Sequence, residues 1–280
     1  MGRVVIASKA HYFLWVDPEW ARKELLPLFD WDLDATRAAQ AWQGLLSWGR
    51  VTAELLEALT PAAVQLASHL DEVGDRRKRY GSFIAIAAAN IPDDPLAKPW
   101  FGAFLDRASD EDFAQFTWKV DKILESLQTK QKSEIWRNWL KRYLEHRIEF
   151  PPEPEADELT ALFGWSFNLS EQLAELIEGL EALPGRGAAV KRLTWKLQQG
   201  ELENSDPDLL ARLVLALLNH CDSVEYWNLS PLPTVILRLH NENAHTQLIR
   251  ELYEKYLEHG GHEDQELTKV VSHDDGGDHE

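Results

Sequence analysis

Three short stretches of the sequence combine residue types that can do chemistry, and each lacks part of its motif. Residues 164–168 (GWSFN) begin like a nucleophile elbow, in which a serine attacks a carbonyl, but the closing glycine is missing. Residues 185–191 (GRGAAVK) begin like a phosphate-binding loop, but the third glycine of a GxGxxG motif and a Gly-Lys-Ser/Thr ending are both missing. Glu242 and His245 have the Glu-x-x-His spacing of di-iron helices, which need two such pairs on facing helices. We therefore predict no catalytic, cofactor-binding or metal-binding residue, and no cofactor.

Two basic runs of the sequence suggest nucleic-acid binding as an alternative function. Residues 76–79 (RRKR) form a compact cluster, and the helix expected over 130–147 has six Lys or Arg against two Glu, interleaved with Trp136, Trp139 and Tyr143. A positive face that carries aromatic rings suits single-stranded nucleic acid. However, the formal net charge of −18 repels polyanions at long range. Because aromatic residues at helical spacing also favour the core side of a helix, nucleic acid is not the partner that we expect.

The twelve tryptophans exceed the usual share, and tryptophan anchors both helical cores and protein interfaces. Most of them must fill the core, and about four are expected to be exposed, since Trp is seldom fully buried. We place the expected partner-binding residues on the helix over 136–147 and on the turn over 42–50, although both segments fit core and turn positions equally well. These residues are Trp136, Trp139, Lys141, Arg142, Trp42 and Arg50.

The sequence predicts that these residues are positioned by helices. Leucine occurs 42 times against 23 Val plus Ile, and this balance favours helix over strand. Helix starts recur, for example at Asp17-Pro18 and at Ser109, and Phe113, Phe116 and Val120 follow one helical stripe. We predict an all-α fold of about a dozen helices: an irregular helical array, compatible with a HEAT-like stack of helix pairs, with no substantial sheet. Only residues 3–8 (RVVIAS) suggest a short strand or an irregular lead-in.

Three prolines within residues 151–154 mark the best internal boundary, because they cannot sit inside a helix. We expect a short N-terminal segment (1–16), a first helical half (17–150) and a second (151–258), the two halves together forming one continuous domain over 17–258. The proline segment is either a hinge or a rigid turn. Residues 259–280 are acidic and poor in large apolar groups, so we expect a disordered tail.

Composition narrows the class of protein further. The single cysteine, Cys221, excludes a disulfide framework and fits a reducing compartment. No apolar run approaches the roughly 20 residues that a membrane span needs. We therefore expect an acidic cytoplasmic protein without a membrane partner.

Several spaced Trp/Pro/Gly patterns resemble the uncharacterised all-helical domain at the C-terminal end of bacterial sirtuin-like phage-defence proteins. The matching stretches are 17–20 (DPEW) through 26–31 (LPLFDW), 41–46 (AWQGLL) with Gly49-Arg50, and 135–143 (IWRNWLKRY) with Arg147; the helices expected over 209–227 and 248–257 fit the closing section. In that family an upstream sirtuin-like portion consumes NAD, and the helical remainder is thought to sense or regulate. The sequence has neither a Gly-Ala-Gly nucleotide loop nor zinc cysteines, so the resemblance implies a regulatory module and no NAD chemistry.

Together these features predict a non-catalytic protein-interaction, sensor or regulatory module of a bacterial anti-phage system, linked to a sirtuin-like NAD-consuming effector. The expected partner is a defence effector or a phage protein. Two alternatives stay open. One is a hydrolase or nucleotide-processing enzyme whose site is built from scattered Glu, His and Arg side chains. The other is single-stranded nucleic-acid binding through the basic aromatic helix 130–147.

Overall fold

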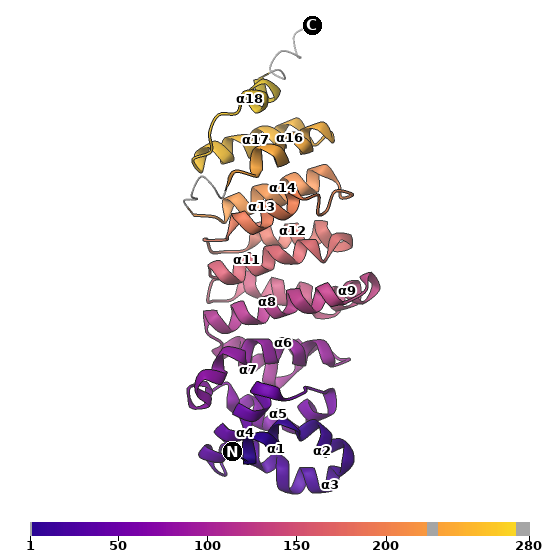
Figure 1. Ribbon diagram of the computed structural model, residues 1–280, viewed down its shortest axis with the longest axis vertical. Helices are drawn as coiled ribbons and strands as arrows, with labels where there is room; N and C mark the ends of the chain where they lie inside the picture. Colours follow the sequence, from indigo (N-terminus) through magenta and orange to yellow (C-terminus); the bar gives the residue numbers. More distant parts are fainter. Residues whose placement is uncertain (1, 223–228, 273–280) are drawn as a thin grey trace. The chain divides into compact units, whose positions relative to one another are not determined.

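Helices make up every regular element of the described chain. The computed structural model describes residues 2–222 and 229–272, and these ranges contain no strand (Figure 1). The all-α prediction is therefore confirmed. None of the helices in these ranges is long and apolar enough to cross a membrane. The chain divides into two compact units: unit 1 comprises Met1–Leu127 and Glu134–Tyr143, and unit 2 comprises Gln128–Ser133 and Leu144–Glu280.

Unit 1 begins with a run of short helices and continues with longer ones. Its elements are α1 (Gly2–Ser8), α2 (Ala10–Val16), α3 (Pro18–Trp20), the π-helical turn η1 (Ala21–Leu25), the 3-10 helix η2 (Leu26–Phe29), α4 (Ala35–Trp48), α5 (Ala53–Leu66), the 3-10 segment η3 (Leu70–Arg79), α6 (Tyr80–Asn90), the 3-10 turn η4 (Pro95–Ala97), α7 (Pro99–Arg107) and α8 (Asp110–Ser126). A helical run follows as α9 (Thr129–Ile135), the π-helical turn η5 (Trp136–Leu140) and α10 (Lys141–Glu149), and it contributes residues to both units.

The strand suggested for residues 3–8 is wrong, because these residues form α1. The helix packs along α4, where Gly44 faces the backbone carbonyl of Val4 so closely that a Cβ atom would have no room. Ala7, Ala10 and Ala41 are fully buried around this contact. Small residues allow two helix backbones to approach, and this tertiary packing outweighs the β preference of the Val-Val-Ile run.

Several helices begin at a residue whose side chain caps the first turn, as the sequence predicted for Asp17 and Ser109. The side chains of Asp17, Asp34 and Asp206 accept backbone N–H bonds at the starts of α3, α4 and α14 (Pro207–Asn219). Ser109 and Asp112 form a reciprocal capping box at the start of α8. Capping is local chemistry between residues two or three positions apart, so the sequence alone exposes it.

An aromatic cluster fills the core of unit 1 between α7, α8 and the helical run that follows. Its rings stand 4.8 to 6.5 Å apart, mostly edge to face, which is the preferred geometry of aromatic pairs. The cluster consists of Phe101, Phe104, Phe113, Phe116, Trp139 and Tyr143, which are all buried.

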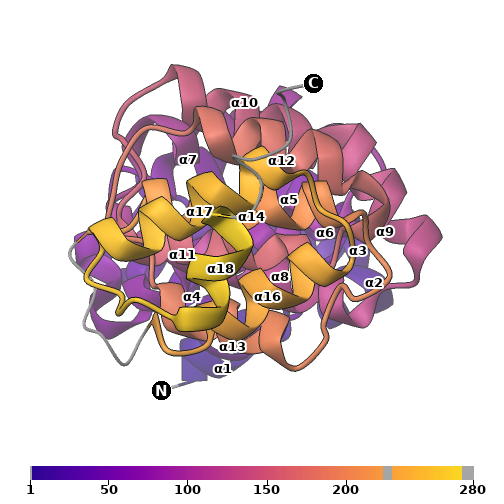
Figure 2. The same cartoon turned by 90° about the horizontal axis from the view of Figure 1, so that it is seen from above.

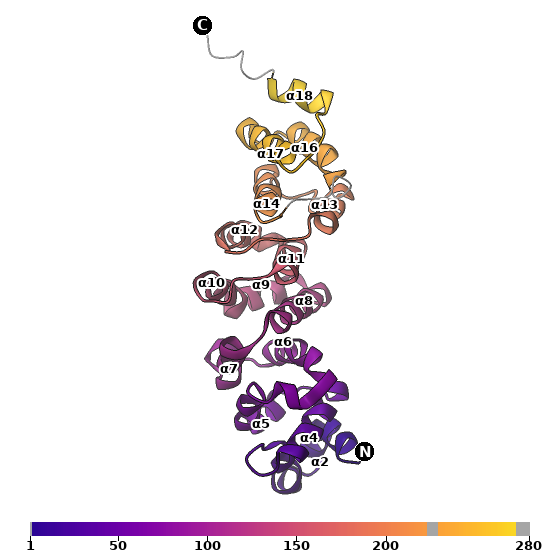
Figure 3. The same ribbon diagram turned by 90° about the vertical axis from the view of Figure 1, so that its left-hand side faces the viewer.

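Unit 2 arranges its helices in two rows. Its elements after α10 are α11 (Ala156–Gly164), the 3-10 turns η6 (Trp165–Phe167) and η7 (Ser170–Gln172), α12 (Leu173–Ala182), α13 (Val190–Gln198), α14, α16 (Leu232–Asn241), α17 (Thr246–Glu258) and α18 (Gln265–Ser272). Helices α11, α13 and α16 form one row and α12, α14 and α17 the other, as Figure 3 shows, in which these helices are viewed along their axes. The two rows contact each other where α16 meets α17 (Figure 2) and where α14 meets α13 and α16. This pairing fits a helix-pair array, and its assignment to the HEAT class stays a prediction.

Two segments differ from the expected division of the chain. The two units separate inside the α9–α10 run, upstream of the boundary expected at residue 151, and Pro151 and Pro152 lie within unit 2. Part of the expected disordered tail is helical: α18 contacts α16 and α17, and Leu267 is fully buried. The hydroxyl of Tyr253 also lies 2.9 Å from that of Thr268. The short helix α18 is amphipathic, and its buried Leu267 holds this segment against α16 and α17. Residues 273–280 lie outside the described residues.

Candidate binding surfaces

The first two helices and α3 expose an unusual number of large apolar side chains. We call this set the N-terminal aromatic surface; it belongs to unit 1, on the helices labelled α1, α2 and α3 in Figure 1. Ring contacts run from Trp15 to Tyr12 (6.3 Å), from Tyr12 to Phe13 (5.7 Å) and from Phe13 to Trp20 (5.5 Å). The surface consists of Val5, Ile6, Tyr12, Trp15, Val16 and Trp20, with Trp15 76% exposed.

This exposure follows from which residues face inward. Ala7, Ala10 and Leu14 are buried, so the opposite side of α1 and α2 carries the bulky residues. Six of the eleven large apolar side chains exposed in the described ranges belong to the first 20 residues. Scattered exposed apolar residues are ordinary, whereas a continuous group of them marks an interaction site.

Lys and Arg outnumber carboxylates in the segment that carries the N-terminal aromatic surface, in contrast to the chain as a whole. Residues 2–23 carry four Lys or Arg and two carboxylates, while the whole chain has a net charge of −18. Burial lowers the pKa of His11 below its usual value, and the nearby cations Arg50 and Lys9 lower it further. His11 is therefore neutral at pH 7, and the field around it is positive. Arg50, which we expected to bind a partner, lies beside this surface.

The tryptophans that we expected to bind a partner are in the core instead. Trp42, Trp136 and Trp139 are at most 4% exposed, and the indole Nε1 of Trp42 donates to the carbonyl of Phe29 at 3.1 Å. Such side chains offer no surface to another protein. Five other tryptophans are exposed: Trp15, Trp20, Trp48, Trp118 and Trp195. Trp227 lies outside the described residues.

The three expected cationic contacts, Arg50, Lys141 and Arg142, are on the surface. Arg142 already holds the loop before α7, because its guanidinium lies 2.6 Å from the carboxylate of Asp94. A part for these three residues in partner binding stays a prediction.

The basic runs are engaged within the chain. Arg77 lies near Asp71 and 3.5 Å from the buried carboxylate of Asp112, and Arg79 donates to the carbonyl of Ser47 at 2.7 Å. In the helix 130–147, Arg147 is buried and paired with Glu158. The ion pairs of Arg77 and Arg147 offset part of the positive charge on which nucleic-acid binding would depend.

The serine and the glycines of two incomplete motifs, residues 164–168 and 185–191, form hydrogen bonds and turns of the backbone. Ser166 is fully buried and donates to the carbonyl of Phe163 at 2.7 Å, so its hydroxyl has no access to a substrate. Gly185 and Gly187 have φ angles of 94° and 101°, which other residues rarely adopt, and the N–H of Gly187 donates to the carbonyl of His220 at 2.7 Å. The glycines thus shape the turn between α12 and α13.

The Glu-x-x-His pair does not share a helical face as its spacing suggested. Glu242 ends α16, and His245 is the N-cap of α17, where its Nδ1 accepts from the N–H of Gln247 at 3.3 Å. No group of three or more His, Cys, Asp or Glu side chains that could hold a metal occurs in residues 2–222 and 229–272.

A cysteine–histidine pair that sequence reasoning missed lies between α14 and α17. The Sγ atom of Cys221 lies 3.7 Å from Nδ1 and 3.6 Å from Nε2 of His259. Burial raises the pKa of the thiol to about 11, and the thiol donates to the carbonyl of Leu218 at 3.1 Å. Because only the thiolate is a nucleophile, Cys221 is a structural thiol at neutral pH.

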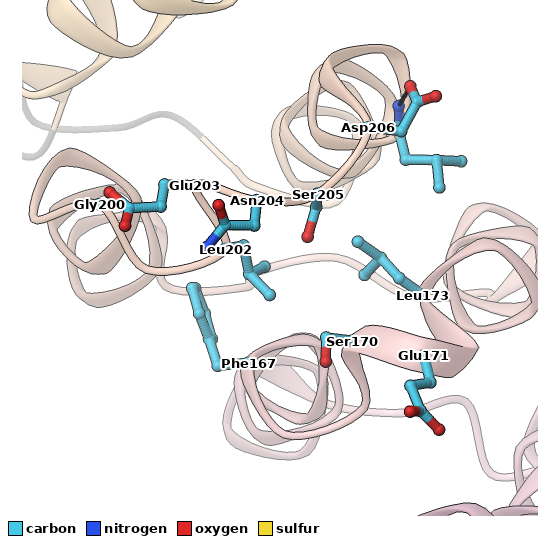
Figure 4. Close-up of a pocket in the computed structure, with 11 residues that line it drawn as sticks. Phe167, Ser170, Glu171, Leu173, Gly200, Leu202, Glu203, Asn204, Ser205 and Asp206 are labelled. Carbon is cyan, nitrogen blue, oxygen red and sulfur yellow. Dashed lines mark hydrogen bonds between the residues drawn. The ribbon is translucent and has the colours of Figure 1, made fainter. Parts of the chain in front are cut away.

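An open pocket of about 580 Å³ lies within unit 2, between the start of α12 and the loop that leads into α14 (Figure 4). Phe167 and Leu202 point toward each other across it, while the carboxylates of Glu171, Glu203 and Asp206 point away from it. Eleven residues line it: Phe167, Ser170, Glu171, Leu173, Gly200, Leu202, Glu203, Asn204, Ser205, Asp206 and Leu209. They come from two segments about thirty residues apart, and no sequence motif links them.

Comparison of the chain with protein-family models, curated proteins and solved structures finds no match. The resemblance to the sirtuin-associated helical domain therefore rests on the sequence patterns alone.

Proposed function

We propose that the chain is a non-catalytic protein-interaction module that docks a protein partner on the N-terminal aromatic surface. The observation that carries the proposal is the series of ring contacts that joins the exposed Trp15, Tyr12 and Trp20 through the half-buried Phe13. These rings belong to α2 and α3, which both contact η1. Tyr and Trp supply large contact areas at a low cost in side-chain entropy and dominate interface energetics.

Charge defines the chemistry of the partner. Lys9 and Arg50 place a positive field beside the rings, which favours an apolar surface bordered by carboxylates. An isologous dimer through the same surface would bring Lys9 and Arg50 of both copies into one interface and is disfavoured by this repulsion. The proposed occupant is therefore a different protein, with an acidic border around an apolar centre.

We also propose which kind of protein the partner is. The resemblance points to a sirtuin-like NAD-consuming effector or a phage protein in a bacterial defence system. A sensor or regulator of such an effector needs a binding surface and no catalytic group of its own. The N-terminal aromatic surface meets that need.

The test is quantitative affinity capture from the cells that make the protein, with three baits. They are the wild type, the double variant Tyr12→Ser/Trp15→Ser, and Trp118→Ser as a control that removes an exposed tryptophan of unit 1 elsewhere. The proposal expects a protein that is recovered with the wild type and the control but lost with the double variant, and that binds the wild type directly once purified. Identical recovery with all three baits would overturn it. Sedimentation of the wild type that shows a dimer, dissociated by the double variant, would also overturn it in favour of a second copy.

A further inference from the structure

Helix α18 lies across the two helices that precede it in unit 2, and it contacts both α16 and α17 (Figure 1). Leu267 is fully buried, and Val270 and Val271 are half-buried. Residues three and four positions apart share one face of a helix. The apolar stripe of α18 therefore faces α16 and α17, and we call the side of these two helices that α18 and residues 261–264 cover the capped face.

Two tyrosines of α17 fasten the chain to the capped face. The hydroxyl of Tyr253 lies 2.9 Å from that of Thr268 and accepts the N–H of Asp264 at 3.3 Å. The hydroxyl of Tyr256 accepts the N–H of His262 at 3.2 Å. Both tyrosines are at most 5% exposed. The capped face thus combines aromatic rings with hydroxyl groups that bond to the segment seated on it.

The attachment of α18 is small for a helix. Among residues 265–271, Leu267 alone is buried. A helix of eight residues is too short to be stable by itself in water, so its order depends on this contact. Gly260, in the connection from α17, has a φ angle of 88° and open space around it. Segments with few buried apolar contacts open at a low cost in free energy, so we expect α18 to detach while the rest of unit 2 stays folded.

We propose that the capped face is a docking site for an amphipathic helix of a partner protein, and that α18 competes with that helix for it. The seated segment defines the chemistry of the partner: a leucine, apolar residues three and four positions later, and polar residues elsewhere. Partner helices commonly bind through such anchors. This site is in unit 2 and is independent of the N-terminal aromatic surface in unit 1.

The tether sets the affinity that a free helix of this kind should have. Residues 259–264 join α17 to α18, and a short flexible linker gives an effective concentration in the millimolar range. A segment that is docked in most molecules therefore has a dissociation constant of about 1 mM or below as a free peptide. The partner helix must bind more tightly than this, because α18 lowers its apparent affinity by the fraction of molecules that are open.

The test is an NMR titration of the full chain with a synthetic peptide of residues 261–272 as the probe. In the full chain, Leu267→Ser removes the buried anchor and should open the capped face. This variant is expected to bind the peptide with a dissociation constant of about 1 mM or below, with shifts in the amide signals of α16 and α17. The wild type should bind roughly tenfold more weakly, because its own α18 is in place. A peptide that carries Leu267→Ser should bind neither protein.

A matched variant and a second measurement complete the test. Glu266→Gln changes an exposed position of the same helix and should behave like the wild type. Amide hydrogen exchange of the wild type needs no substitution, and α18 should exchange at least roughly tenfold faster than α17.

Four outcomes would overturn the proposal. They are absence of peptide binding to the Leu267→Ser chain, equal peptide binding by this chain and the wild type, and exchange in α18 that is as slow as in α17. The fourth is a wild-type dimer in sedimentation that Leu267→Ser dissociates, because it would assign the capped face to α18 of a second copy.

Discussion

Arg147 and Glu158 form a buried, two-pronged ion pair across the proline turn between α10 and α11. Nε of Arg147 lies 2.8 Å from Oε1 of Glu158, and Nη2 lies 2.8 Å from Oε2. Both side chains are 1% exposed. The pair fastens the helices on either side of Pro151 and Pro152, which favours a rigid turn over a hinge at this point of unit 2.

Removal of one partner of this pair should destabilise unit 2 strongly. Glu158→Ala leaves the Arg147 guanidinium buried without its carboxylate, which costs about 3–5 kcal/mol of unfolding free energy. Arg147→Met/Glu158→Leu removes both charges and should lie much closer to the wild type. Urea denaturation followed by circular dichroism measures the difference. A loss below about 1 kcal/mol in Glu158→Ala would contradict the burial of the pair.

Two tryptophans should respond oppositely to truncation. Trp136 is 1% exposed, so Trp136→Ala should lower the unfolding free energy by about 3–5 kcal/mol. Trp15 is 76% exposed, so Trp15→Ser should change it by no more than about 0.5 kcal/mol. Thermal and denaturant melts of the two variants check this. A large loss in Trp15→Ser would mean that this ring is part of the core.

Gly44 should not tolerate alanine. Alanine is the better helix former by about 1 kcal/mol, but its Cβ would collide with the carbonyl of Val4, and such overpacking costs typically 1–3 kcal/mol. Gly44→Ala should therefore loosen α1 from α4, visible as faster amide hydrogen exchange in α1. Gly102 in α7 has open space around it, so Gly102→Ala is the control and should be neutral or stabilising. Unchanged exchange in α1 of Gly44→Ala would contradict the close packing.

The reactivity of Cys221 should depend on pH in an unusual way. An ordinary thiol ionises near pH 8.5, whereas burial raises the pKa of Cys221 to about 11 in the folded protein. The rate of alkylation by iodoacetamide should therefore keep rising up to about pH 11 in the folded chain and level off near pH 9 in guanidinium. Because the unfolded thiol loses its proton first, the contribution of Cys221 to stability is lost as the pH rises from about 8.5 to 11. An alkylation rate that levels off near pH 9, while circular dichroism still shows folded protein, would contradict this.

The cations beside the N-terminal aromatic surface should act on the rate of association. Lys9→Glu/Arg50→Glu reverses the local field that lowers the pKa of His11. Association with an acidic partner should slow several-fold at low salt, with little change in the rate of dissociation. Surface plasmon resonance at two salt concentrations measures both rates. An association rate that does not depend on these charges would contradict the proposal that the partner has an acidic border.

Local chemistry made much of the fold predictable. The caps at Asp17 and Ser109 depend on residues within three positions, and the stripe of Phe113 and Phe116 depends on helical period alone. Helix α1 was missed because its Val-Val-Ile run favours a strand, and the contact that overrides this preference is with Gly44, about forty residues away.

The binding surfaces were harder to predict for the same reason. Helix α2 (AHYFLWV) is apolar almost all round, a pattern typical of burial. Which of its sides stays exposed depends on where Ala10 and Leu14 pack, and only the three-dimensional structure shows this. Trp42 and Trp136 lie on segments that fit core and partner-binding positions equally well by sequence. The structure buries both side chains.

The central claim is that the N-terminal aromatic surface holds a protein partner. The most direct measurement is the dissociation constant of the purified partner with the wild type, Tyr12→Ser/Trp15→Ser and Trp118→Ser, determined by isothermal titration calorimetry. Loss of one interface hot spot costs about 2 kcal/mol, so the double variant should bind at least roughly 30-fold more weakly, while Trp118→Ser binds like the wild type. Equal affinity of all three proteins would contradict the account.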